Sequence, residues 1–254
     1  MHTTIDLAAD IGEGFGSYTM GDDARILDAV SSANVACGFH AGDPRTMESS
    51  VTACLDRGVA IGAHPGFPDM VGFGRRAMDL SPDEVRTDVL YQIGALQAFA
   101  TAAGTRVGHV SPHGRLGNLV VTSDAYAVPV LDAIESLDPT LVVVTYSGRL
   151  EQLARERGLR VGLMAFPDRA YEDDGSLASR REPGAVIHDP ELIAERAVTL
   201  ATDGTVTSRS GAVIQVECHS LLLHGDNAAS VDAAHLVRGH LDRAGVVISP
   251  LLAK

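Results

Sequence analysis

The sequence has almost no lysine: Lys254 is the only one among its 254 residues. A Walker-type phosphate loop ends in Gly-Lys-Ser/Thr, so the chain cannot contain one, and a catalytic lysine Schiff base is excluded on the same ground. Tryptophan is absent and aromatic residues make up only 4% of the chain, whereas hydrophobic residues make up 45%. The core must therefore be aliphatic, as it is in α/β proteins with buried parallel strands.

The sequence is also poor in cysteine and in positive charge. Its three cysteines, Cys37, Cys54 and Cys218, form no CxxC pair, which is typical of a protein from a reducing compartment. The formal net charge of −13 argues against nucleic acid as a partner, since phosphate binding needs a basic surface. No apolar run approaches the ~20 residues needed to cross a bilayer, and no signal peptide is visible. We therefore expect a cytoplasmic protein with neither a nucleic-acid nor a membrane partner.

Short aliphatic runs alternate with amphipathic helical stretches along the chain. Seven or eight such strand–helix units predict a parallel sheet. The favoured architecture is an α/β fold, a (β/α) barrel of about seven parallel strands formed by one domain, residues 1–254; a doubly wound open sheet is the alternative. The expected strands are 4–10, 32–37, 59–63, 106–110, 140–145, 159–166 and either 213–217 or 221–223. The expected helices are 22–30, 44–57, 81–103, 124–136, 149–157, 190–201 and 229–244.

Almost every aliphatic run ends in a polar residue followed by glycine or proline. These residues are Asp10, His40, His64, His113, Asp168 with Arg169, and His224 with Asp226. In parallel α/β folds such strand ends lie on one rim, where the active site is built. A single histidine there is more often structural, but four of them joined by three carboxylates favour a site. The group can hold a divalent metal that activates water, with Asp10, His40 and His64 as ligands, or act as general acid and base without one.

Two loops that follow predicted strands carry further functional signals. In the stretch 62–76, which is rich in glycine and proline, Arg75 and Arg76 either orient a substrate carboxylate or form a solvated pair. The loop 12–16 offers backbone amides to an anion, but it is not a dinucleotide-binding fingerprint. His109 lacks the strand-end context, as do five other histidines, and we expect all six to be surface or packing residues.

Long motifs in this sequence resemble the LamB/YcsF family. They are residues 6–16, 32–44 and 62–76, extended by Pro112-His113-Gly114, 168–171, Asp174-Gly175, 184–187 and His224-Gly225-Asp226. The resemblance covers essentially the whole chain. It implies a barrel like those of glycoside hydrolases and deacetylases. It also implies the role of the A subunit in a prokaryotic ATP-dependent 5-oxoprolinase, which converts 5-oxo-L-proline, ATP and water to L-glutamate, ADP and phosphate together with B and C subunits.

Because the chain has no phosphate loop, we expect the B and C subunits to handle ATP while this chain binds the lactam and assists ring opening. The expected acid and base residues are Asp10, Glu13, His64 and His113. The expected substrate-binding residues are Asn34, His40, Arg75, Arg169, His224 and Asp226. The chain departs from the family at Ser111, where lysine is usual, and at Ala8, where asparagine is usual. A stand-alone metal-dependent amidase or deacetylase and a non-catalytic subunit that stabilises its partners are the alternative functions.

Overall fold

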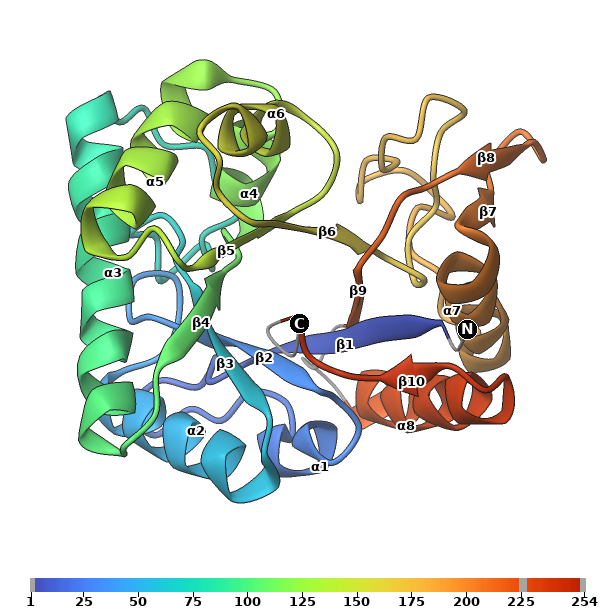
Figure 1. The fold of residues 1–254 in the computed structure, drawn as a ribbon, viewed down its shortest axis with the longest axis horizontal. Helices are drawn as coiled ribbons and strands as arrows, with labels where there is room; N and C mark the ends of the chain where they lie inside the picture. The colour runs from blue at the N-terminus through green and yellow to red at the C-terminus, as the bar shows by residue number, and fades with distance from the viewer. Residues whose placement is uncertain (1–2, 224–227, 252–254) are drawn as a thin grey trace.

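Seven parallel strands form a closed barrel in the computed structural model, which describes residues 3–223 and 228–251. In chain order the strands are β1 (Thr4–Ile11), β2 (Ser32–Ala36), β3 (Ala60–His64), β4 (Val107–Val110), β5 (Val142–Thr145), β6 (Val161–Ala165) and β9 (Ser220–Leu223). The barrel closes because β9 pairs with β6 on one side and with β1 on the other (Figure 1). A short strand, β10 (Val247–Ile248), adds to the beginning of β1.

Helices surround the barrel on its outer face (Figure 1). They are α1 (Asp23–Leu27), α2 (Pro44–Arg57), α3 (Pro82–Ala102), α4 (Gly114–Val120), α5 (Asp124–Leu137), α6 (Arg149–Glu156), α7 (Pro190–Asp203) and α8 (Ala228–Arg243). The sequence sets several of the helix ends. Ser81 and Glu84 form a reciprocal capping box at the start of α3, and Asp43 caps α2. Gly58 ends α2 at a φ of +67°, which an L side chain rarely adopts.

The barrel interior is divided into a polar half and an apolar half. Along β1, Leu7 and Ala9 belong to the core packed under the helices, so the alternate residues Asp6, Ala8 and Asp10 face inward. The apolar half consists of Ala8, Val142, Val144, Met164, Phe166 and Leu222, with Leu251 packed against it. The polar side chains of β1 to β4 fill the other half. The chemistry of the barrel is therefore concentrated on its first four strands.

The predicted fold class is confirmed, and the open-sheet alternative is wrong because the sheet closes. Residues 221–223 supply the seventh barrel strand. Residues 213–217 instead contain β8 (Val213–Gln215), which pairs antiparallel with β7 (Thr205–Thr207) outside the barrel. Helix α4 was not expected from the sequence, since only seven residues separate His113 from Val121. None of the helices among the described residues is long and apolar enough to cross a membrane.

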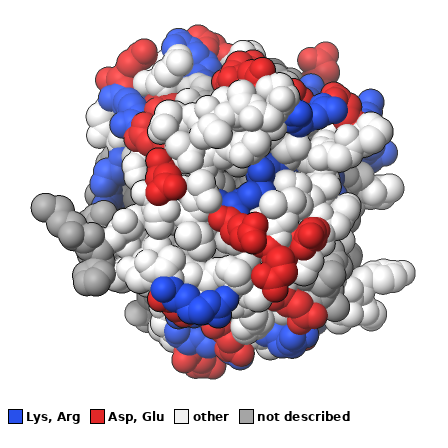
Figure 2. Space-filling view, turned by 90° about the vertical axis from the view of Figure 1, so that its right-hand side faces the viewer, with Lys and Arg blue, Asp and Glu red and all other residues white. Residues whose placement is uncertain are grey.

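The face that carries α7 and the β7–β8 hairpin mixes charges of both signs. Figure 2 shows acidic and basic side chains interspersed there among broad uncharged areas. Some of these charges are paired: Arg209 lies between Glu172 and Glu182. Exposed pairs of this kind contribute little to stability, because both charges are well solvated.

Asp6 is a buried carboxylate near the amino ends of the strands, far along β1 from Asp10. Its Oδ1 accepts hydrogen bonds from the hydroxyls of Ser31 and Ser32, both at 2.7 Å, and its Oδ2 accepts one from Ser220 at 2.6 Å. Burial raises the pKa of Asp6, although the three hydroxyl donors act to lower it. Because the donors come from β9, from β2 and from the residue before β2, the carboxyl group connects the three strands where the barrel closes.

The Asp6→Asn variant should become more stable relative to the wild type as pH rises. The pKa of Asp6 in the folded protein lies above its unfolded value of about 3.9. Protonated Asp6 therefore stabilises the fold at low pH, and this contribution is lost as pH rises through the folded pKa. We expect the melting temperature of Asp6→Asn minus that of the wild type to increase between about pH 4 and pH 8, by about 2–4 °C per kcal/mol. The exposed control Asp203→Asn should show no such trend, and a constant difference for Asp6→Asn would contradict the assignment.

Candidate functional site

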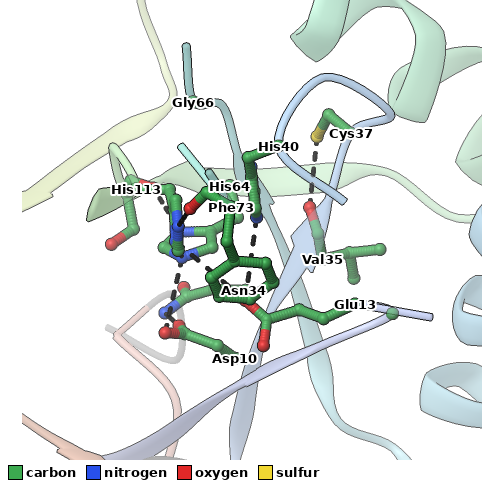
Figure 3. A network of polar contacts seen from close by, with 12 residues as sticks. Asp10, Glu13, Asn34, Val35, Cys37, His40, His64, Gly66, Phe73 and His113 are labelled. Atoms are coloured by element: carbon green, nitrogen blue, oxygen red, sulfur yellow. Dashed lines mark hydrogen bonds and ion pairs between the residues drawn. The ribbon is translucent and has the colours of Figure 1, made fainter. Parts of the chain in front are cut away.

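The carboxyl ends of the first four strands bring one carboxylate and three imidazoles into a single buried group. Glu13 follows β1, His40 follows β2, His64 ends β3, and His113 follows β4 as the residue before α4. One potential ligand atom from each of the four lies within 4.8 Å of the others, and all four residues have largely buried side chains. Figure 3 shows these side chains pointing toward one another, with Asp10 beside them. The predicted convergence of strand ends is therefore present.

The three imidazole rings pack against one another in a fixed arrangement. The rings of His40 and His113 are stacked, with centroids 3.7 Å apart, and His64 meets both rings edge-on. The ring of Phe73 covers His40 and His113 from the loop after β3, with centroids 5.6 and 5.1 Å away. This packing leaves the rings little freedom to rotate, so their nitrogen atoms are held in place.

Two glycines allow the loop after β3 to lie directly on the rings. A Cβ atom at Gly66 would come within 2.7 Å of Nδ1 of His40. A Cβ atom at Gly74, whose φ is +61°, would lie 2.8 Å from Cβ of His40 and 2.9 Å from Cδ2 of His113. Both distances are shorter than real contacts allow, so any larger residue would push the loop away from the site. The glycine-rich composition of this loop therefore has a direct packing reason.

The hydrogen bonds of His64 and His113 require a positive charge between the two rings. His64 Nδ1 donates to the carbonyl of Ser111 at 2.6 Å, and His113 Nε2 donates to the carbonyl of Phe73 at 2.8 Å. Both of these nitrogens therefore carry a proton. The remaining pair, His64 Nε2 and His113 Nδ1, lies 3.0 Å apart. Two bare nitrogens at that distance would repel, so either one ring is an imidazolium or a cation lies between them.

The surrounding charges place this proton on His64. Burial acts to lower the pKa of His64, but the carboxylates of Asp10 and Glu13 outweigh it, and the pKa is raised. Asp10 Oδ2 lies 3.4 Å from His64 Nε2. The pKa of His113 is lowered to about 3 by burial and by the charge on His64, and the pKa of His40 is also lowered by burial and by its histidine neighbours. Without a metal, the site contains one imidazolium and two neutral imidazoles.

The donor set also fits a divalent metal ion. Both ring nitrogens of His40 are buried and have no hydrogen-bond partner among the described residues, which is unusual for buried polar atoms. Three imidazoles and one carboxylate are ligands that zinc and similar ions prefer. A bound ion would supply the positive charge between His64 and His113 and would lower the pKa of a bound water. Of the predicted set of Asp10, His40 and His64, this group contains the two histidines, with Glu13 and His113 in addition, and it does not include Asp10.

Proteins of a known family are similar in sequence to this chain along almost its whole length. The sequence model of the LamB/YcsF family matches residues 5–254. The chain belongs to the LamB/YcsF family. It is 49% identical to a 5-oxoprolinase A subunit of Pseudomonas syringae pv. tomato over 98% of both chains, and 46% identical to the 5-oxoprolinase A subunit of Gluconobacter oxydans over 98% of both. The predicted family membership is therefore confirmed.

Solved structures confirm the architecture of this LamB/YcsF chain. A lactam utilization protein from Thermus thermophilus superposes with a TM-score of 0.93 at 45% identity, covering 97% of this chain and 99% of the other. A family 4 carbohydrate esterase from Streptomyces lividans shares only 12% identity, with a TM-score of 0.50, and covers 98% of this chain and 93% of the other. The second likeness supports the predicted deacetylase-like barrel and concerns the fold alone.

Asn34 of this LamB/YcsF chain lies under the site rather than in its mouth. Its Nδ2 donates to Oδ1 of Asp10 at 2.9 Å, and its Oδ1 accepts from Nε2 of His109 at 2.8 Å. It is almost fully buried in the barrel interior. Its amide is thus engaged by protein groups, which favours a supporting role over the predicted substrate contact.

The other predicted substrate-binding residues have different surroundings. Arg75 is exposed and its guanidinium stacks on the Phe73 ring at 4.8 Å, close enough for its charge to lower the pKa of His40. Arg76 instead binds Asp69, whose carboxylate also accepts from the amide of Gly72 and shapes this loop. Arg169 is buried and donates to the carbonyls of Ala185 and Ala178, so it supports the loop after β6. His224 and Asp226 lie outside the described residues.

His109 and Gln92 are the structural contributors to the site that were not expected. His109 was predicted to be a surface or packing residue; it is buried in the barrel interior, and its ring also forms a hydrogen bond with Asn34. Gln92 of α3 is fully buried and holds Gly66 by both its amide and its carbonyl, each at 2.9 Å. Gln92 could have been noticed in the sequence, because it is a polar residue on the apolar face of a long helix. No comparable signal existed for His109, because its orientation depends on the register between β3 and β4.

Proposed function

We propose that this chain is the A subunit of an ATP-dependent 5-oxoprolinase. The observation that carries the proposal is the convergence of Asp10, Glu13, His64 and His113 in a chain 49% identical over nearly its whole length to a protein bearing that name. The proposed overall reaction converts 5-oxo-L-proline, ATP and water to L-glutamate, ADP and phosphate. The absence of a phosphate loop and of any lysine before Lys254 supports assigning ATP to the B and C subunits.

The chemistry of a lactam explains why such an enzyme needs a positioned acid. A five-membered lactam is an unstrained amide, so phosphorylation of its oxygen by ATP is needed to drive hydrolysis. When water adds to the ring carbonyl carbon of the phosphorylated lactam, the resulting tetrahedral intermediate can expel either phosphate or the ring nitrogen. Expulsion of phosphate regenerates the lactam and wastes the ATP. Protonation of the nitrogen opens the ring and gives the acyl phosphate, which a second water converts to glutamate and phosphate.

The geometry of the site supports one division of these roles. His64 carries the proton beside Asp10 and acts as the general acid toward the ring nitrogen. Glu13 lies beside the other two imidazoles, with Oε1 3.7 Å from Nε2 of His40 and 4.0 Å from Nδ1 of His113, and acts as the general base toward water. Arg75, exposed beside Phe73, binds the carboxylate of the substrate. Asp10 keeps His64 charged and oriented.

The proposal is tested by following glutamate formation from 5-oxo-L-proline. The chain is assayed alone and after co-expression with its B and C subunits, with and without ATP. We expect turnover only with all three subunits and ATP. If the complete complex forms no glutamate, the proposed function is wrong. If the chain alone hydrolyses the lactam with ATP, the assignment of ATP to the partners is wrong.

A metal-dependent amide hydrolase acting alone is the second candidate function. It is favoured by the two buried nitrogens of His40, which have no hydrogen bond among the described residues, and by the mutual proximity of Glu13, His40, His64 and His113. Metal analysis of the protein purified without chelator tests this candidate. A stoichiometric divalent ion, with amide hydrolysis that chelation removes and the metal restores without ATP, would support it. Metal-free protein that remains active in the complex would exclude it.

A further inference from the structure

His109 lies in the barrel interior beneath the site, where it can affect the geometry of the site residues. It belongs to β4, is almost fully buried, and forms a hydrogen bond with Asn34. The contacts run from His109 Nε2 to Asn34 Oδ1 at 2.8 Å, from Asn34 Nδ2 to Asp10 Oδ1 at 2.9 Å, and from Asp10 Oδ2 to His64 Nε2 at 3.4 Å. Four strands each contribute one member to this series. The series therefore connects the barrel interior to the proposed general acid.

The carboxylate of Asp10 determines which group donates and which accepts in each hydrogen bond of the series. The carboxylate of Asp10 only accepts, so Asn34 must present its amide nitrogen to it and its carbonyl oxygen to His109. His109 must then donate from Nε2. Burial lowers the pKa of His109 to about 4, so the ring is neutral near pH 7 and carries its single proton on Nε2. Without this donor the carbonyl of Asn34 loses its partner, and the amide is held only by its bond to Asp10.

The neighbouring strand is shaped to receive the His109 ring. A Cβ atom at Gly62 of β3 would lie 1.9 Å from Nε2 of His109, so only glycine leaves room for the ring. The pairing of β3 with β4 shifts by one residue at this point, because Ile61 faces Val107 whereas Gly62 faces His109. The extra residue in β4 turns the imidazole into the barrel. Both features place the ring where it meets Asn34.

We propose that His109 is a positioning residue that fixes the orientation of the Asn34 amide, so that Asp10 holds one oxygen against Asn34 and directs the other at His64. Its effect on turnover rests on the proposed hydrolase function. Because the ring does not reach the mouth of the site, its loss should slow the chemical step while substrate binding persists. A side chain that restores a donor at the same place should restore the rate.

The kinetic test compares His109→Leu, His109→Gln and the control Val142→Ala in the complete complex. Val142 faces His109 across the β4–β5 pair but belongs to the apolar half of the barrel. We expect His109→Leu to lower kcat by about 10²-fold with KM changed less than about 3-fold, since displaced catalytic groups cost about this much. His109→Gln should recover most of the rate, because its amide donates to Asn34. Equal losses in His109→Leu and Val142→Ala, or no recovery with glutamine, would overturn the proposal.

A spectroscopic test is independent of turnover. Nitrogen-15 NMR of protein labelled in histidine, with the His109 signals assigned by their loss in His109→Gln, reports which ring nitrogen carries the proton. We expect a neutral ring protonated at Nε2 throughout about pH 6–8. A ring protonated at Nδ1, or at both nitrogens, would overturn the proposal even if the complex is active. If the complex forms no glutamate but the Nε2 proton is found, the proposed function fails and the positioning role of His109 stands.

Discussion

Replacing His64 by alanine should lower kcat of the complete complex by about 10³-fold, with KM changed only a few fold. The variant removes the proposed general acid, and loss of a positioned acid or base costs about 10²–10⁴-fold. It also leaves Asp10 without the positive charge that faces it at 3.4 Å. The measurement is the rate of glutamate formation at saturating 5-oxo-L-proline and ATP, using the same B and C subunits for every variant.

The control for this variant is His235→Ala, which changes an exposed histidine on the outer helix α8. Its turnover should match that of the wild type. If His64→Ala retains more than about a third of the wild-type rate while the complex still forms, the chain has no acid at this position. The alternative of a non-catalytic subunit that only stabilises its partners would then be favoured.

Gly62→Ala should be the most destabilising single-methyl change in the barrel interior. The added Cβ atom would overlap the His109 ring at 1.9 Å, and the ring is held by β4 and by its hydrogen bond to Asn34. Overpacking of this kind costs about 3 kcal/mol, which for a chain of this length lowers the melting temperature by about 6–12 °C. Thermal unfolding followed by circular dichroism measures the effect.

Gly94→Ala provides a matched control for the same chemical change. Gly94 lies within α3, and a Cβ atom there would have no neighbour within 4 Å. Replacing an interior helical glycine by alanine should stabilise the protein by about 0.5–1 kcal/mol. If Gly62→Ala melts within about 2 °C of the wild type, the close approach of β3 to the His109 ring does not exist in solution.

The fold could be predicted from the sequence because most strand ends carry a recognisable signal. Aliphatic runs that stop at Asp10, His64 and His113 are each followed within a few residues by glycine or proline, which is typical of strands running into functional loops. The hairpin of β7 and β8 could not be predicted in the same way. Its residues 213–217 are as apolar as a barrel strand, and only the pairing of 221–223 with both β6 and β1 distinguishes the two.

Site residues that lie at strand ends could be predicted from the sequence. Residues whose orientation depends on the register between two strands could not. His40, His64 and His113 meet because the carboxyl ends of parallel strands share one rim. His109 turns inward because β4 takes up one extra residue opposite Gly62, a shift that no periodicity reveals. Arg169 illustrates the opposite case, since a charged residue at a strand end is used to bind carbonyls of its own loop.

The most direct test of the account is a double-mutant cycle between Glu13→Gln and His64→Ala in the complete complex, read as kcat for glutamate formation. Groups that act together as base and acid on one substrate are not additive when removed. We therefore expect the double variant to be within about 5-fold of the slower single variant. Losses that multiply would contradict the claim that the strand ends form one catalytic unit.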